Sequence, residues 1–480
     1  MGPHLLSVLL PVTVGLLLIV LASGSVRKAD TVLGGVMPQA NDPMVSELLV
    51  VGNEAVFSAD DGVHGREPWF VDLHGNTSMV QDLAPGPDSS NPRHFRMRGL
   101  GDFVFSASTP VSGEELWLGS ISSDLCTVEL IKDIIPGPMG SEPIVVGSSD
   151  ALILFYATTL TAGRELWCTN AVSAQQTAMV SDFYAGVQSS LPMSPTVLPD
   201  TEGAYVVAYA DAVRGCLLFR YDYATGAIRT LVDVEDGAGA MTELGASLIF
   251  ANSDSAHGWE LWHYEKDTGE FGVLLDLEPG TESAGPSQFF TWRERVLFQA
   301  STQEYGKELW ITDGTAAGTR LLSDINPGPH DSDPYGFVAA GDHVFFRAKD
   351  DTCGQELWVT DGTPSGTRRV VDLMPGPGSG DPYNLVAYGQ GLYFSADDGA
   401  TGEELWWARL VDGEWHTEQV ADLYPGLEGS EPTNLQFTTG GQGYFLARSP
   451  AEGRTVFTFL PGSTEGREKV VPVQMRLETP

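Results

Sequence analysis

Basic residues are scarce in this chain of 480 residues. It holds 26 Lys and Arg against 64 Asp and Glu, which gives a formal net charge of −38. Such a surface repels phosphate backbones and anionic lipids, so nucleic-acid binding would need a basic stripe, and the sequence contains none. The few arginines also form no cluster along the chain of the kind a sialidase needs for its carboxylate substrate. The charge favours solubility through self-repulsion, with affinity for divalent cations as the sharper alternative.

Cysteine is equally rare. The chain has four, Cys126, Cys168, Cys216 and Cys353, with no C-x-x-C pair, which excludes zinc-finger and thioredoxin-type sites. Four cysteines permit three pairings. Cys168 and Cys216 could meet across a seam between neighbouring units, or the thiols could remain free and buried.

Motifs of catalysis are also missing. The nine histidines form no H-x-x-x-H or H-E-x-x-H pair, and there is no G-x-S-x-G elbow, Walker loop or Cys-His signature. The sequence therefore predicts no catalytic residue and no firm cofactor.

The tripeptide Glu-Leu-Trp, by contrast, recurs throughout the chain. A glycine precedes the aromatic residue by four positions in each copy, and two diverged copies have Phe219 and Phe457 in place of the tryptophan. The nine aromatic anchors are Trp69, Trp117, Trp167, Phe219, Trp262, Trp310, Trp358, Trp406 and Phe457. A period near 48 residues is typical of propeller blades.

One unit, residues 334–382, shows four short β-rich stretches separated by Asp, Gly and Pro turns. We therefore predict an all-β fold, a β-propeller of four-stranded blades built from nine units, with eight or nine blades in a closed ring. An open β-solenoid is the competing architecture. Along the strand of this unit that holds the tripeptide, Leu357 would face one neighbouring blade and Glu356 and Trp358 the other. Either residues 469–475 supply the last outer strand, or Thr31–Leu33 closes the ring.

Acidic residues recur at two further places in the unit. An aspartate near the end of the fourth strand is predicted to fix a turn, with calcium ligation as the alternative. The loops between second and third strands could hold Ca²⁺, or they are solvated turns; the candidate ligands are Asp60, Asp61, Asp350, Asp351, Asp397 and Asp398. The recurring Glu should be partly buried as a bracket with amide or hydroxyl partners.

Two segments resemble a known repeat family. Residues 308–319 and 356–367 match in full the consensus that names the ELWxxDGT repeat family, and the other units keep part of it. The resemblance covers roughly residues 43–470. It implies propeller-like β structure in exported or surface proteins, and it implies no catalytic activity.

The first residues are distinct from the repeats. Leu5–Ala22 is an apolar run followed by Ala22-Ser23-Gly24, which predicts a signal peptide or an N-terminal anchor over residues 1–24. Residues 25–42 would be a linker or closing strand, and residues 43–480 the propeller. The protein would be secreted or at the cell surface, with Asn76 as one possible glycosylation site and membrane contact only through residues 5–22 if these are retained.

These observations together predict a non-catalytic, exported propeller that acts as a binding or adhesion scaffold for an unknown protein or glycan ligand, with Ca²⁺ as a stabilising ion. The alternative is a carbohydrate-active hydrolase or lyase with a carboxylate pair at the channel mouth.

Overall fold

A computed structural model describes the chain from residue 45 to residue 473, together with two short strands before it. Gaps in the described range fall at residues 100, 123, 149–151, 171–175, 191–196, 200–201, 212–214, 235–238 and 462–469. The early strands, β1 (Leu18–Val20) and β2 (Val26–Lys28), pair only with each other. The predicted closing strand at residues 31–33 and the rest of the predicted signal segment lie outside the described residues. Within those residues no helix is long and apolar enough to cross a membrane.

Nine four-stranded antiparallel sheets follow one another along the chain, each formed by four consecutive strands. Blades 1 to 3 comprise β3 (Ser46–Val51), β4 (Glu54–Asp60), β5 (Arg66–Val71), β6 (Thr77–Met79); β7 (Arg93–Met97), β8 (Asp102–Thr109), β9 (Gly113–Ser122), β10 (Leu125–Lys132); β11 (Ile144–Ser148), β12 (Ile153–Thr159), β13 (Gly163–Thr169), β14 (Ala178–Met179). Blades 4 to 6 comprise β15 (Val197–Pro199), β16 (Gly203–Asp211), β17 (Gly215–Asp222), β18 (Ile228–Val234); β19 (Met241–Leu244), β20 (Ser247–Asp254), β21 (Gly258–Glu265), β22 (Phe271–Leu275); β23 (Ser287–Trp292), β24 (Arg295–Thr302), β25 (Gly306–Thr312), β26 (Arg320–Ser323). Blades 7 to 9 comprise β27 (Tyr335–Ala340), β28 (His343–Asp350), β29 (Cys353–Thr360), β30 (Arg368–Arg369); β31 (Tyr383–Tyr388), β32 (Gly391–Asp397), β33 (Glu403–Val411), β34 (Glu414–Ala421); β35 (Thr433–Phe437), β36 (Gly443–Ser449), β37 (Gly453–Phe459), β38 (Val471–Pro472).

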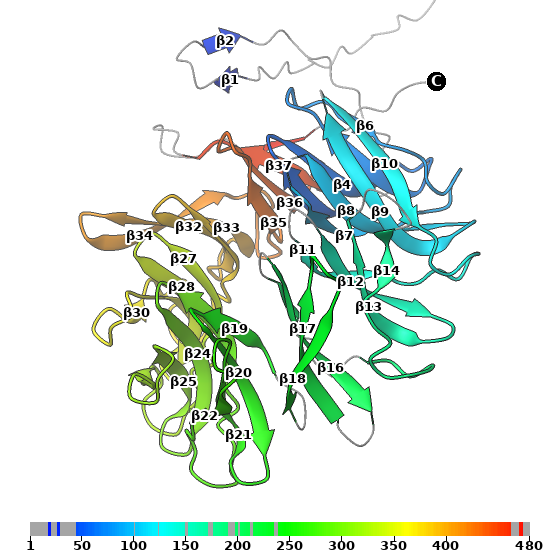
Figure 1. Cartoon of the computed structure of the whole chain (residues 1–480). Coiled ribbons are helices and arrows are strands. Elements are labelled where there is room, and N and C mark those ends of the chain that lie inside the picture. Colours follow the sequence, from blue (N-terminus) through cyan, green and yellow to red (C-terminus); the bar gives the residue numbers. More distant parts are fainter. Residues whose placement is uncertain are drawn as a thin grey trace, which may run out of the picture.

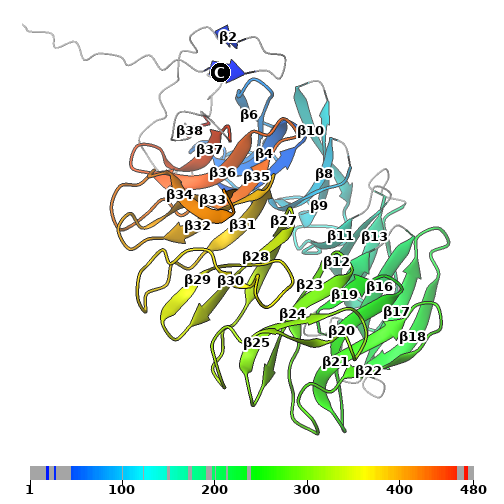
Figure 2. The ribbon, with the colours of Figure 1, turned by 90° about the vertical axis from the view of Figure 1, so that its left-hand side faces the viewer.

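These sheets are the blades of a nine-bladed β-propeller, which confirms the predicted fold class (Figures 1 and 2). Successive first strands contact one another around most of the ring, as β3 does with β7 and β27 with β31. They therefore surround the central channel, and each is the edge strand of its own sheet.

The Glu-Leu-Trp strands fill the seams on both of their faces. Trp310 packs among residues of blade 5, including Leu261, whereas Leu309 packs among residues of blade 7, including Val344. This opposite placement follows from the two-residue period of a strand. Each seam therefore becomes a dry apolar layer that holds neighbouring blades together.

Ring closure uses side-chain contacts and one backbone hydrogen bond, from Thr439 N to Gly52 O at 3.0 Å, and no exchanged strand. All four strands of blade 1 come from the start of the ordered fold and all four of blade 9 from its end, where β38 lies within the C-terminal segment predicted to supply the last outer strand. Gln436 of blade 9 bridges to β3: its Oε1 accepts from Val50 N at 2.9 Å and its Nε2 donates to Leu48 O at 2.7 Å. Thr439 Oγ1 donates to Asn53 Oδ1 at 2.7 Å, so hydrogen bonds close a seam that is otherwise apolar.

Candidate functional site

The two faces of the ring differ in what they carry. Because the strands are antiparallel, the loops between second and third strands lie on the same face as the connections from one blade to the next. We call this the entry face, since every first strand begins there. The opposite face carries the turns between first and second strands and between third and fourth strands, and we call it the turn face.

On the entry face, the glutamate of each Glu-Leu-Trp strand ties down the connection to the following blade. Glu308 is fully buried; it accepts from Ile325 N at 2.8 Å, from Asn326 N at 3.1 Å and from Ser332 Oγ at 2.7 Å. We call this arrangement the clasp. The same fully buried glutamate with partners in the following connection occurs at Glu67, Glu115, Glu165, Glu260, Glu356 and Glu404.

Burial changes the acidity of the clasp carboxyls. It raises the pKa of Glu115, Glu165, Glu260 and Glu308 to about 7, although the amide and hydroxyl donors act in the opposite direction. The pKa of Glu67, Glu356 and Glu404 is raised for the same reason. These groups therefore bind a proton in the folded chain at a pH where an exposed glutamate is ionised.

Two blades have no glutamate at the clasp position. Blade 9 has Thr455 there, and it has no following blade to hold. Blade 4 has Leu217, which packs in the seam with blade 3 and has no polar group to accept from an amide.

The aspartate at the end of the fourth strand lies in the turn that leads away from the blade. Asp324 Oδ2 accepts from Gly328 N at 3.3 Å, and Asp82 Oδ2 accepts from Gly86 N at 3.2 Å. Asp276 and Asp182 make the same bond to a glycine four residues on. A carboxylate oxygen thus fixes the Pro-Gly turn.

The candidate calcium ligands lie at the tips of separate loops, one group to a blade. Asp60 Oδ1 accepts from Gly62 N at 2.7 Å, and Asp61 Oδ1 accepts from Val63 N and His64 N. The corresponding bonds within the loop are made by Asp350, Asp397 and Asp398, whereas Asp351 bonds to Asn326 through its backbone N and its Oδ1.

Hydroxyl side chains take over these turn bonds in other blades. Thr109 Oγ1 accepts from Ser112 N at 3.0 Å and Thr159 Oγ1 from Ala162 N at 3.0 Å, at the loop position that Asp61 holds in blade 1. A neutral oxygen therefore suffices for the turn. Among the described residues, no group of three or more His, Cys, Asp or Glu side chains is arranged to hold a metal ion.

Basic side chains gather at the channel end of the entry face. Seven of them contact a residue at or just before the start of a first strand, and Arg93 is itself the first residue of β7. Together we call them the collar: Arg66, Arg93, Arg164, Lys307, Arg347, Lys349, Arg448 and Arg454. Eight of the 26 basic residues thus lie at one place in a strongly acidic chain. The sequence showed no arginine cluster because these residues come from different blades.

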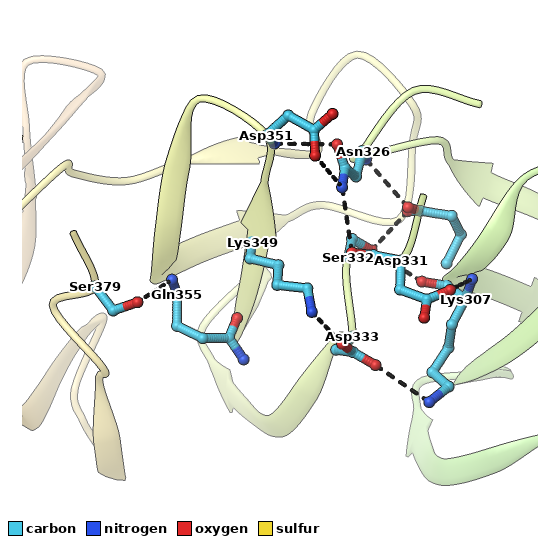
Figure 3. A network of polar contacts seen from close by, with 10 residues as sticks. Lys307, Asn326, Asp331, Ser332, Asp333, Lys349, Asp351, Gln355 and Ser379 are labelled. Atoms are coloured by element: carbon cyan, nitrogen blue, oxygen red, sulfur yellow. Dashed lines mark hydrogen bonds and ion pairs between the residues drawn. The ribbon is translucent and has the colours of Figure 1, made fainter. Parts of the chain in front are cut away.

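Carboxylates of adjacent blades pair with the collar. Asp333 lies 3.2 Å from Lys307 Nζ and 2.6 Å from Lys349 Nζ, and these cations hold the pKa of Asp333 below its usual value despite its burial (Figure 3). Glu431 lies 2.9 Å from Arg448 and 3.7 Å from Arg454. The side chains of Lys307, Lys349 and Arg448 are 39%, 41% and 33% exposed, so the collar presents accessible charges of both signs to the channel mouth.

The aromatic anchors lie in the seams between blades. Seven of the nine are buried, and Trp358 and Trp406 are half-buried against the same kind of apolar cluster. Asn76 lies in the turn between β5 and β6, where its Nδ2 donates to Asp72 Oδ2 at 2.8 Å. No disulfide joins the four cysteines, all of which lie in the described part of the chain, and Cys168 Sγ lies 3.2 Å from Tyr221 Oη of the neighbouring blade.

No protein-family model and no curated protein matches the chain. Solved structures do match. A structure from a study of two prolyl endopeptidases matches at 13% identity with a TM-score of 0.43, over 75% of this chain and 54% of that one. A puromycin hydrolase matches at 14% identity and a TM-score of 0.39, over 85% and 58%, so the chain spans little more than half the length of either. The β-propeller domain of the Trilobed protease from Pyrococcus furiosus matches at 13% identity and a TM-score of 0.35, over 71% of this chain and 99% of that domain. At these identities the likeness describes the fold alone.

These matches correct the predicted function. The matched structures include a puromycin hydrolase, prolyl endopeptidases and an acylaminoacyl peptidase, which contradicts the prediction of a non-catalytic adhesion scaffold stabilised by Ca²⁺ with a carbohydrate-active enzyme as its alternative. The prediction was based on family resemblance and on the absence of catalytic motifs. Neither of these identifies what a propeller channel admits.

Proposed function

We propose that this protein is the substrate-admitting ring of a peptidase-type hydrolytic system, and that it is exported through its N-terminal apolar run, Leu5–Ala22. The observation that carries the proposal is the collar, a concentration of accessible charge at the entry-face end of the channel. A polypeptide has charged groups of both signs, which the collar matches with its paired Lys, Arg, Asp and Glu side chains.

The channel wall adds a second feature that suits a polypeptide. Each first strand is hydrogen-bonded within its sheet on one side only, and these strands surround the channel. The free edge of a strand offers backbone N–H and C=O groups to an extended chain. Backbone bonding accepts many sequences, and the collar would add selection by charge. Endopeptidases among the matched structures act on this class of substrate.

Peptide binding tests the proposal. We would titrate the full chain against a fluorescent, extended acidic peptide and compare the double variant Arg448→Gln/Arg454→Gln with the matched double variant Arg320→Gln/Arg409→Gln, which removes two basic groups outside the collar. Loss of two partly exposed charge contacts should weaken binding by roughly tenfold. Equal affinities for the two double variants, or no peptide binding by the unaltered chain at low salt, would refute the proposal.

A further inference from the structure

Large apolar side chains protrude from the entry face on blades 2 and 3. Val111 is 78% exposed, Met139 63%, Leu160 66% and Val187 70%. We call these four side chains the apolar loop patch. Val63 of blade 1 extends it at 59% exposed. Side chains of this size rarely protrude together without a partner.

The four side chains come from loops that lie against each other in pairs. A Cβ placed on Gly113, two residues after Val111, would lie 2.6 Å from the carbonyl carbon of Met139. A Cβ on Gly163, three residues after Leu160, would lie 2.8 Å from Val187 O. Each blade therefore presents two apolar tips side by side.

The same loops in blades 5 to 7 are different, although the connection after blade 8 carries one exposed apolar side chain, Leu427, at 75%. In blades 5 to 7 the loop between second and third strands carries Ser255-Ala256, Gln303-Glu304 and Asp351-Thr352, and the connection beside it carries Thr281-Glu282, Pro329-His330 and Pro377-Gly378. The blade architecture thus tolerates polar tips. The apolar tips of blades 2 and 3 are not required by the fold.

The chain itself enters the propeller at this face. The first strand of blade 1 begins at Ser46, whose Oγ accepts from Arg66 on the entry face. The chain therefore enters blade 1 at the entry face, the face from which the apolar loop patch protrudes. The last strand, β38, also ends toward this face.

We propose that the apolar loop patch docks on the surface of an uncharged, zwitterionic lipid bilayer. Protruding loop tips can enter the headgroup region individually, whereas a flat protein interface would need a continuous apolar surface. The net charge of −38 opposes both anionic lipids and a second copy of this chain. The collar residues of blades 6, 7 and 9 would stay open to water, because only the edge formed by blades 1 to 3 touches lipid. The inference goes beyond the proposed function and does not depend on it.

Fluorophores attached to the protein and measured with lipid vesicles test which face of the ring meets the bilayer. In a Cys168→Ser background of the full chain, we would attach an environment-sensitive fluorophore to Val111→Cys or Val187→Cys, and as matched controls to Leu125→Cys or Leu410→Cys. The controls replace exposed apolar residues of turn-face hairpins, 63% and 44% exposed. The three remaining native thiols are buried.

With phosphatidylcholine vesicles that carry a spin-labelled quencher in the bilayer, labels at residues 111 and 187 should shift to the blue and lose fluorescence, and the two control labels should do neither. A triple substitution, Val111→Ser/Leu160→Ser/Val187→Ser with the label at Met139→Cys, should abolish the quenching. Equal quenching on both faces or no quenching at all would overturn the proposal. Concentration-dependent self-quenching without vesicles would assign the patch to a second copy instead.

Discussion

Removal of a clasp carboxylate should loosen one joint of the ring. In the Glu308→Ala variant, the backbone N–H groups of Ile325 and Asn326 lose their acceptor in a site that water does not reach. The hydroxyl of Ser332 retains a second acceptor, Lys307 O at 3.3 Å, so its loss is smaller. Each unsatisfied buried donor costs about 1–3 kcal/mol, and we therefore expect a loss of about 4 kcal/mol in the free energy of unfolding.

The matched control is Thr455→Ala, which alters the same strand position in the blade that has no following connection. Thr455 is 6% exposed, and its truncation should cost about 1 kcal/mol. Guanidinium unfolding gives the two free energies, and amide hydrogen exchange locates the change, which should fall in residues 324–333. If both variants lose equal stability, or if exchange in this segment stays at the level of the unaltered chain, the clasp does not hold the joint.

Three further outcomes follow from the structure. The pKa of Glu115, Glu165, Glu260 and Glu308 is about 7 in the folded chain, above the ordinary 4.5. Their contribution to stability is therefore fully present below pH 4.5 and is lost as pH rises through 7. The melting temperature should fall between about pH 5 and 8 in a calorimetric series, and Glu308→Gln should reduce that fall. Gly113→Ala should lower the free energy of unfolding by at least about 3 kcal/mol, because φ is +64° and the new Cβ would lie 2.2 Å from Gly140 N. The control Gly62→Ala, at φ +78° in open space, should lower it by only about 1 kcal/mol. Similar losses of stability in the two variants would contradict the packing argument. Gln436→Leu removes both bonds to β3 and should speed amide exchange at the backbone N–H of Val50, and an unchanged rate would show that this bridge does not protect β3.

The strands and their packing were largely predictable, because they depend on local periods. The recurring tripeptide predicted opposite faces for Leu309 and Trp310, and the structure places them in different seams. The bracket role of the glutamate was also predicted from its burial. The recurrence of its serine partner at Ser90, Ser141, Ser190, Ser332 and Ser430 was a signal in the sequence that would have identified the clasp.

Features that join distant segments were not predictable from local patterns. Gln436 and Val50 meet across the closure although 386 residues separate them, and no period relates them. The collar is similar: Lys349 and Lys307 belong to different blades, and only the ring geometry brings both to Asp333. The Asp-Asp-Gly loops were ambiguous for another reason, because a solvated turn and a cation site have the same sequence pattern. Thr109 and Thr159, which replace the aspartate in other blades, became recognisable only from the structure of the loops.

Closure without an exchanged strand has a consequence for how such a ring can change in evolution. Every blade is a contiguous stretch of chain, and the seam between blades 9 and 1 requires only that two sheet surfaces fit together. Duplication or loss of one whole unit would leave both of those surfaces intact. The circumference could therefore grow or shrink by one unit at a time, with the width of the channel changing accordingly, and no terminal strand would need to find a new neighbour.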